Sequence, residues 1–322
     1  MRNKLTYLLI AAAAIMASAC AKTQADKPDN SIHFSPVAAK STKAIISGTT
    51  YPIDESFSVN AYVDGTYTYF EDNVASYSST SALWETSTSE YWPLSGSLDF
   101  VAYSPSSAQG ITTSASGISA ENYTITSGAQ MTTDLCYASA TVADCSNHPE
   151  YVSLTFSHAL SQVVFRVKAA SYYNTSGRTV SIYLNSLAMA GIYSVGDLSD
   201  GTWENQESEN TYSLSTTPTP LTYDANNLPE TIDICSYLFI PQELGPNAEL
   251  RVGYSVNQTV NSAPYNLDNP PVSIPLGSTV TEWQPGKKYI YTISIGMDNL
   301  ITFTASAVGW LDENDNIIVE EN

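Results

Sequence analysis

Apolar and polar residues alternate in short stretches along most of the chain from residue 31 onward. This alternation predicts half-buried β-strands, because successive side chains of a strand point to opposite faces of a sheet. Helical periodicity is almost absent, and only the Ser/Ala-rich segment 106–120 is expected to hold a helical turn or a long loop. The pattern predicts an all-β fold of antiparallel sheets packed as β-sandwiches. The expected strands are 56–63, 97–105, 152–169, 179–189, 231–242, 249–256, 288–296 and 300–310.

Polar residues and Pro149 interrupt this pattern at 144–151. We place a domain boundary there, with an N-terminal β-sandwich over residues 44–148 and a C-terminal β-sandwich over residues 149–322. Both lengths lie in the usual range for a domain.

The first 19 residues are typical of an export signal. A short basic start precedes an apolar run that is too brief to span a bilayer. Small residues, Ala17 to Ala19, then lead directly to Cys20, as in a bacterial lipoprotein signal. We therefore predict a signal peptide over residues 1–19 and lipidation, with chains such as palmitate, at Cys20. An ordinary secretory signal followed by a chance cysteine is the alternative.

The charge balance excludes one class of partner. The chain carries 12 basic and 32 acidic residues, a formal net charge of −20. Such a chain is repelled by phosphate backbones, so we expect no nucleic-acid binding. Attachment to a membrane would have to come from the lipid on Cys20 rather than from a basic patch.

Candidate chemistry is sparse. None of the three histidines, His33, His148 and His158, has another histidine three to five residues away, and no GxSxG motif or phosphate-binding glycine loop occurs. We therefore expect no enzyme, no cofactor and no catalytic or metal-binding residues, and we expect His158 to pack and hydrogen-bond. With 32 acidic residues, a glycosidase-like carboxylate pair stays open as an alternative.

Cysteines and aromatic residues leave two further questions open. Cys136 and Cys145 could form a disulfide in an oxidising compartment, whereas Cys235 reads as a small buried apolar residue. The aromatic residues of the first domain could stack on sugars, or they could fill cores and interfaces, which strand propensity favours. These residues are Tyr51, Tyr62, Tyr67, Tyr69, Tyr77, Trp84, Tyr91 and Trp92.

Six stretches, in this order, resemble the fimbrillin family, the pilins of Bacteroidetes type V pili. They are SFSVNAYV (56–63), YWPLSGSLDFVAYSP (91–105), LTFSHALSQVVFRVKA (154–169), YLFIPQ (237–242), WQPGKKYIYTISI (283–295) and SAVGW (306–310). The resemblance implies two tandem transthyretin-like antiparallel β-sandwich domains in a surface-exposed lipoprotein of the outer membrane. It also implies an assembly route to a fimbrium that serves cell adhesion. A protease removes an N-terminal strand, and a strand of another pilin subunit, in a homo- or hetero-polymer, takes its place.

Carried onto this sequence, the resemblance assigns residues 20–43 to a tether and a removable strand. Ile32, Phe34 and Val37 would fill the groove, and Lys43 or Lys40 would be the cleavage site. The two lysines could instead belong to a solvated basic linker.

The far C-terminus offers a poor donor strand. The apolar residues of 316–322 are consecutive rather than alternating, so stalk and tip or accessory roles both stay open. The alternative function is that of a monomeric surface lipoprotein that binds a glycan or a host ligand.

Overall fold

The computed structural model describes residues 30–38, 51–126, 128–297 and 301–309. Within these residues the chain is built from β-strands and three short 3₁₀ turns, so the all-β prediction is confirmed. The turns are η1 (Gly128–Met131), η2 (Cys145–Asn147) and η3 (Leu276–Ser278). No helix in the described part of the chain is long and apolar enough to cross a bilayer.

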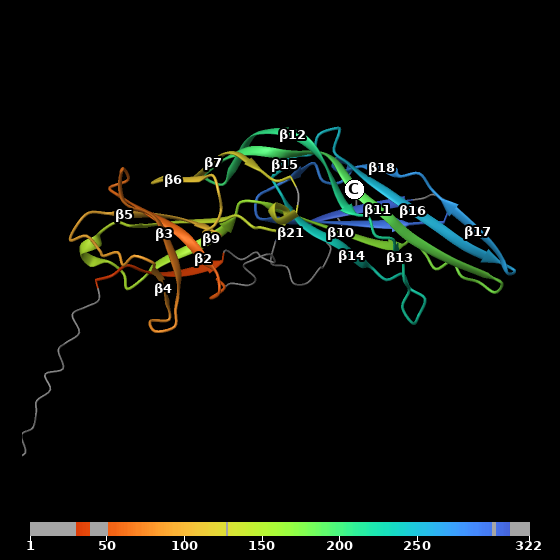
Figure 1. Cartoon of the computed structure of the whole chain (residues 1–322), viewed down its shortest axis with the longest axis horizontal. Coiled ribbons are helices and arrows are strands. Elements are labelled where there is room, and N and C mark those ends of the chain that lie inside the picture. Colours follow the sequence, from red (N-terminus) through yellow and green to blue (C-terminus); the bar gives the residue numbers. More distant parts are fainter. Residues whose placement is uncertain (1–29, 39–50, 127, 298–300, 310–322) are drawn as a thin grey trace, which may run out of the picture.

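The molecule is elongated, with seven strands at one end that close on themselves as a barrel (Figure 1). Their order around the barrel is β1-β4-β3-β2-β5-β8-β9. They are β1 (His33–Ala38), β2 (Ser56–Val63), β3 (Tyr67–Ser78), β4 (Leu83–Thr86), β5 (Leu98–Ser104), β8 (Cys136–Val142) and β9 (Val152–His158).

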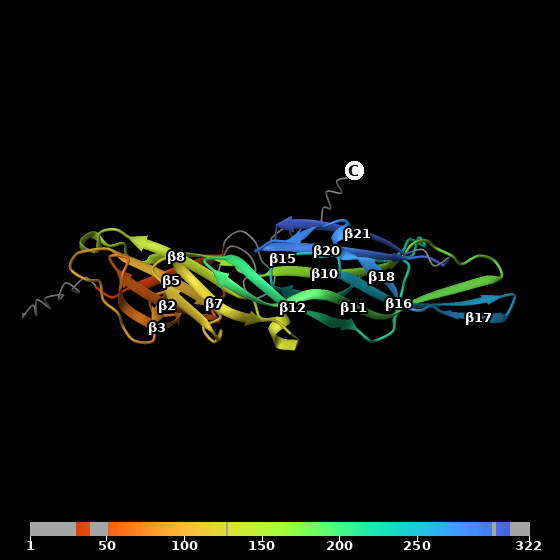
Figure 2. The same cartoon turned by 90° about the horizontal axis from the view of Figure 1, so that it is seen from above.

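Two larger sheets and a short ribbon form the rest of the described molecule, and β7 of the larger sheet lies beside the barrel (Figure 2). The four-stranded sheet has the order β14 (Ile232–Phe239), β10 (Ser161–Ala169), β20 (Lys287–Ile295), β21 (Ile301–Gly309). The eight-stranded sheet contains β6 (Ile111–Ser114), β7 (Gly117–Thr124), β11 (Arg178–Ser199), β12 (Thr202–Ser215), β13 (Thr219–Pro220), β16 (Glu249–Val260), β17 (Ala263–Asp268) and β18 (Val272–Pro275). The ribbon pairs β15 (Gln242–Glu243) with β19 (Glu282–Trp283).

The sequence pattern predicted antiparallel sheets, but two pairs of neighbouring strands are parallel. β1 runs parallel to β9, and β10 runs parallel to β20. A parallel pair needs a long crossover, and more than a hundred residues separate the strands of each pair. Alternation of side chains does not depend on strand direction, so the sequence pattern could not distinguish the two cases.

Two segments connect the ends of the molecule differently from the sequence prediction. Segment 106–120, expected as a helical turn or loop, contains β6 and the start of β7, a hairpin that pairs with β11. The stretch 152–169, expected as one strand of the second domain, forms β9 in the barrel and β10 in the four-stranded sheet. The proposed boundary at 148/149 thus lies between two barrel strands, and the two-domain division stays a prediction.

The buried apolar residues form two clusters. One fills the barrel, and the other lies between the two larger sheets. The second cluster also includes Tyr62, Val101 and Tyr103 of the barrel strands, together with Ile118 and Ala120 of β7. The hairpin therefore covers the outside of the barrel and joins the two ends through an apolar layer.

Candidate functional site

The strand β1 closes the barrel between β4 and β9. Phe34 to Ala38 pair in parallel with Val152 to Phe156, and His33 and Phe34 pair with Glu85 and Trp84. Both edges of β1 are thus paired with a neighbouring strand, although the pairing with β4 covers only two residue pairs. β1 is the first described strand in the chain, and both of its neighbours, β4 and β9, come later in the sequence.

Alternate residues of β1 and its approach point into the barrel core. Ile32 is 2% exposed and Phe34 is fully buried. The Phe34 ring meets the edges or faces of Phe57 and Phe100, with centroids 5.9 and 5.7 Å apart. Two of the three residues predicted to fill a groove therefore lie in the core.

The third inward position belongs to Pro36, which is buried, whereas Val37 is 36% exposed. The resemblance to the fimbrillin family had implied that Val37 fills the groove. The alternation that begins at Ile32 instead brings every second residue, and hence Pro36, to the inner face.

A polar clamp holds the chain just before β1. Backbone hydrogen bonds run from Trp92 N to Asn30 O (3.0 Å) and from Ile32 N to Glu90 O (2.7 Å). The Asn30 carboxamide donates to Trp92 O at 3.1 Å and lies 3.2 Å from Nε2 of His148. The His148 ring stacks on Trp92, with centroids 4.6 Å apart. These partners lie some 60 to 118 residues from Asn30, so no local sequence signal could have shown the clamp.

The other predicted processing residues fall outside the described residues. Cys20 precedes the first described residue, Asn30, and Lys40 and Lys43 lie between the described segments 30–38 and 51–126. Lipidation and cleavage stay predictions. Tyr51 itself is fully buried in the barrel core beside Phe57 and Phe156.

His158 lies in the interior with two polar neighbours. It is 4% exposed, and its Nδ1 lies 2.5 Å from Asp134 Oδ2 and 3.3 Å from Cys136 Sγ. The expectation that His158 packs and hydrogen-bonds is confirmed. Cys136 and His158 face each other directly in the β8–β9 ladder.

Cys136, Cys145 and Cys235 are all free thiols in the structure, so the disulfide left open by the sequence is not formed there. Burial raises the pKa of each thiol, and for Cys136 the neighbouring Asp134 carboxylate raises it further. Since the thiolate is the reactive form, all three are expected to be poor nucleophiles in the folded protein.

We therefore expect slow alkylation of these three cysteines in native buffer and complete alkylation in denaturant without reductant. Peptide mass spectrometry would locate the modified residues. A Cys136–Cys145 peptide that needs reductant before it reacts would contradict the structure.

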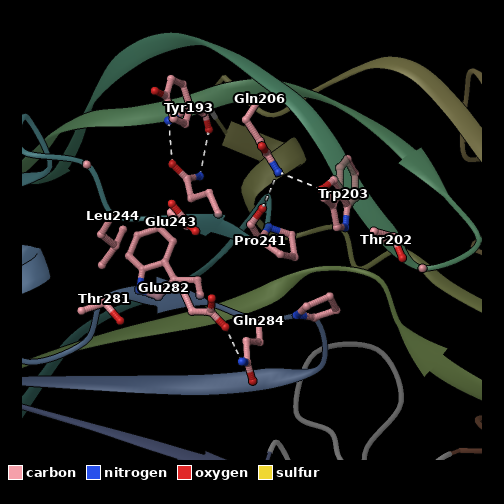
Figure 3. A pocket seen from close by; sticks show the side chains of 15 residues that line it. Tyr193, Thr202, Trp203, Gln206, Pro241, Glu243, Leu244, Thr281, Glu282 and Gln284 are labelled. Carbon is pink, nitrogen blue, oxygen red and sulfur yellow. Dashed lines mark hydrogen bonds between the residues drawn. The ribbon is translucent and has the colours of Figure 1, made fainter.

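An open pocket of about 900 Å³ lies between the start of β12 and the β15–β19 ribbon (Figure 3). Its floor is braced by Gln242, whose carboxamide accepts from Tyr193 N at 2.8 Å and donates to Tyr193 O at 3.2 Å. Gln206 donates to Trp203 O and Pro241 O.

Acidic side chains stand at the ribbon beside this pocket. Glu243 and Glu282 are directly opposite each other in the ladder, and Gln284 donates to Glu282. Carboxylates and carboxamides together suit a ligand with several hydroxyl groups better than an anion. Sequence analysis missed this pocket, because its walls come from segments about 40 residues apart.

The aromatic residues of the barrel divide between core and surface. Tyr51, Tyr62, Trp84 and Trp92 are buried, as the core interpretation requires. The residues available at the surface include Tyr67, Tyr69 and Tyr91, which are 72%, 37% and 56% exposed. Tyr69 donates its hydroxyl to Tyr91 O at 2.7 Å, so these two lie side by side.

A family model described as fimbrillin-like matches residues 16–310. The chain belongs to the fimbrillin-like family. The resemblance inferred from sequence is thereby confirmed. Membership supports an adhesin or pilin role and a location at a fimbrium or the cell surface for this fimbrillin-like protein.

Solved structures that are similar to this chain include proteins of Bacteroides and Porphyromonas species. A candidate cell adhesion protein of Bacteroides uniformis is 14% identical, with a TM-score of 0.48 and coverage of 88% of this chain and 100% of that one. One from Bacteroides ovatus is 18% identical, with a TM-score of 0.47 and coverage of 88% and 99%. The fimbrial anchor protein Mfa2 of Porphyromonas gingivalis is 10% identical, with a TM-score of 0.35 and coverage of 87% and 97%. The search of curated proteins gave no match.

Proposed function

We propose that this fimbrillin-like protein is a structural pilus subunit, in a stalk or at a tip or accessory position, that assembles by donor-strand exchange. The observation that carries the proposal is the seat of β1, the first strand, inside a barrel made from later strands. Proteolysis after Lys43 or Lys40 would cut the chain between β1 and the rest of the barrel. A strand from another subunit would then replace β1.

The free energy lost when β1 departs would drive the binding of a strand from another subunit. Its departure would leave unpaired backbone groups on β4 and β9 and an apolar slot where Ile32, Phe34 and Pro36 lie. Burial of one large apolar side chain is worth about 1.5–3 kcal/mol, and an exposed strand edge recruits another strand. An incoming strand with apolar residues at every second position would restore both interactions.

The donor segment is proposed to lie beyond β21. β21 pairs with β20 over nine residue pairs, from Lys287↔Gly309 to Ile295↔Ile301, and would have to leave its own sheet to be donated. The following tail carries Ile317, Ile318 and Val319. In the precursor, the acyl chains on Cys20 would anchor the subunit in the outer membrane with the barrel at the cell surface.

Limited trypsin digestion of the purified chain tests the proposal. The basic residues after Lys43 all lie in strands, so Lys40 and Lys43 are the preferred sites for releasing β1. The strand residues are Arg166, Lys168, Arg178, Arg251, Lys287 and Lys288. We expect removal of the N-terminal 43 residues, or of 40 if Lys40 is cut, followed by a ladder of oligomers on electrophoresis without boiling.

The matched control is the double variant Lys40→Gln and Lys43→Gln, which should keep β1 and stay monomeric under the same digestion. If the trimmed protein loses β1 and still stays monomeric at high concentration, this result would argue against a stalk subunit and against strand donation between copies of this chain. If it also fails to take up a strand peptide with the β1 pattern, donor-strand exchange is contradicted.

The pocket beside the β15–β19 ribbon supports a second candidate function, the binding of a glycan or host ligand. Its polar lining and its volume of about 900 Å³ suit several sugar units. The excess of acidic residues favours neutral rather than anionic glycans. A glycan array with the intact chain, and with Gln206→Ala as the comparison, would detect it.

A further inference from the structure

Three side chains with different donor atoms meet at the junction of β8 and β9. Cys136 is the first residue of β8, His158 is the last residue of β9, and Asp134 lies two residues before Cys136. Their side chains are nearly inaccessible, with whole-residue exposures of 1% for Asp134, 2% for Cys136 and 4% for His158. A carboxylate, a thiol and an imidazole thus share one buried point.

The distances between the donor atoms are short. Sγ of Cys136 lies 3.3 Å from Nδ1 of His158 and 3.4 Å from Oδ2 of Asp134, and all the donor atoms lie within 4.8 Å of one another. Zn²⁺ binds such atoms at about 2.0–2.3 Å, which places tetrahedral ligands about 3.3–3.7 Å apart. Both separations from sulfur already fit. The 2.5 Å between Nδ1 and Oδ2 would have to widen by about 1 Å.

The hydrogen bonds within the cluster do not involve the second carboxylate oxygen of Asp134. Asp134 Oδ1 is buried and has no hydrogen-bond partner among the described residues. A buried, unpaired carboxylate oxygen is costly, and such an atom calls for a cation or another donor. Hydrogen bonds from His158 and Cys136 reach Oδ2 and leave Oδ1 unexplained.

We propose that Asp134, Cys136 and His158 bind one divalent cation of the Zn²⁺ class, with Asp134 contributing both carboxylate oxygens. The two Asp134 oxygens are too close together to occupy two corners of a tetrahedron, so this chelating carboxylate would take one position of a distorted tetrahedral site. A thiolate, a carboxylate and a neutral imidazole balance a 2+ charge, so the buried site is neutral. The sulfur and nitrogen donors disfavour Ca²⁺ and Mg²⁺, which prefer oxygen.

The site lies at the shorter of the two strand pairings that β9 makes in the barrel. Within the barrel β9 pairs with β1 over five residue pairs, but with β8 over two, Cys136↔His158 and Tyr137↔Ser157. If β1 leaves, β9 stays paired within the described barrel through these two residue pairs with β8. The cation would then pin β9 in the open barrel. This consequence rests on the proposed function, whereas binding of the cation does not.

Metal reconstitution of the full chain tests the site. The chain is unfolded in chelator, refolded with one equivalent of ZnCl₂ or CoCl₂ and desalted, and its metal content is measured by plasma mass spectrometry. We expect about one ion per chain and a rise in Tm of about 5 °C when Zn²⁺ exceeds its Kd a hundredfold. The Co²⁺ form should show a near-ultraviolet thiolate charge-transfer band and visible bands of tetrahedral cobalt.

Two variants and two controls assign the ligands. Cys136→Ser and Asp134→Asn should abolish stoichiometric binding, whereas Cys145→Ser and Cys235→Ser should retain both the ion and the thiolate band. If Cys136→Ser does not fold, the two control substitutions combined with Cys20→Ser still decide, because Cys136 is then the one thiol left in the chain. Wild-type protein that retains no metal and shows no change in Tm would overturn the site, as would binding that survives the loss of Cys136. Trimming by trypsin is independent of added metal, so failure of either proposal can be recognised separately.

Discussion

Phe34→Ala is expected to lower the free energy of unfolding of the barrel by about 3–5 kcal/mol. The Phe34 ring is fully buried and packs edge-on against Phe57 and Phe100. Truncation removes this burial and leaves a cavity that a closed barrel cannot easily collapse. Urea denaturation followed by tryptophan fluorescence would measure the loss, because Trp84 and Trp92 lie in the same core.

Val37→Ala is the matched control on the same strand. Val37 is 36% exposed, so we expect a change within about 0.5 kcal/mol. Equal effects of the two substitutions would mean that β1 does not occupy the barrel in the register described. The same pair of variants bears on assembly, since weaker packing of β1 should speed its replacement once the chain has been cut after Lys43 or Lys40.

His158→Ala is expected to cost about 3 kcal/mol or more when measured in the presence of chelator. The imidazole lies 2.5 Å from Asp134 Oδ2 at a nearly inaccessible position. Its removal leaves the buried Asp134 carboxyl group with the Cys136 thiol as its hydrogen-bond donor, and breaking a buried pair typically costs about 3–5 kcal/mol. Chemical denaturation at neutral pH measures the difference.

His148→Ala provides the comparison. His148 is partly exposed, and it stacks on Trp92 and contacts Asn30 at the surface end of β1. Such contacts are worth about 1 kcal/mol, so its loss should be several-fold smaller. A His158→Ala protein as stable as His148→Ala would show that the Asp134–His158 contact contributes little to the fold.

Local pattern predicted the strands well where burial of one face decides the structure. Segment 56–63 is β2 to the residue, and 97–105 differs from β5 by one residue at each end. The local pattern did not by itself place Ile32, Phe34 or Val37 in a groove, which the family resemblance implied. It failed for 106–120, whose small polar residues carry no apolar alternation, although main-chain pairing with β11 makes its second half a strand.

The chain's own sequence determined that this protein is all-β and acidic, and it placed the apolar residues Ile32 and Phe34 two positions apart. Tertiary structure alone decided which strands meet. It placed β1 parallel to β9, brought Asn30 to Trp92 and His148, and set Cys136 opposite His158 across 22 residues of chain. The physical reason is that side-chain alternation encodes which face of a strand is buried, whereas neighbouring strands are chosen by packing and hydrogen bonding over the whole barrel. The candidate cation site and the seat of β1 both depend on that choice.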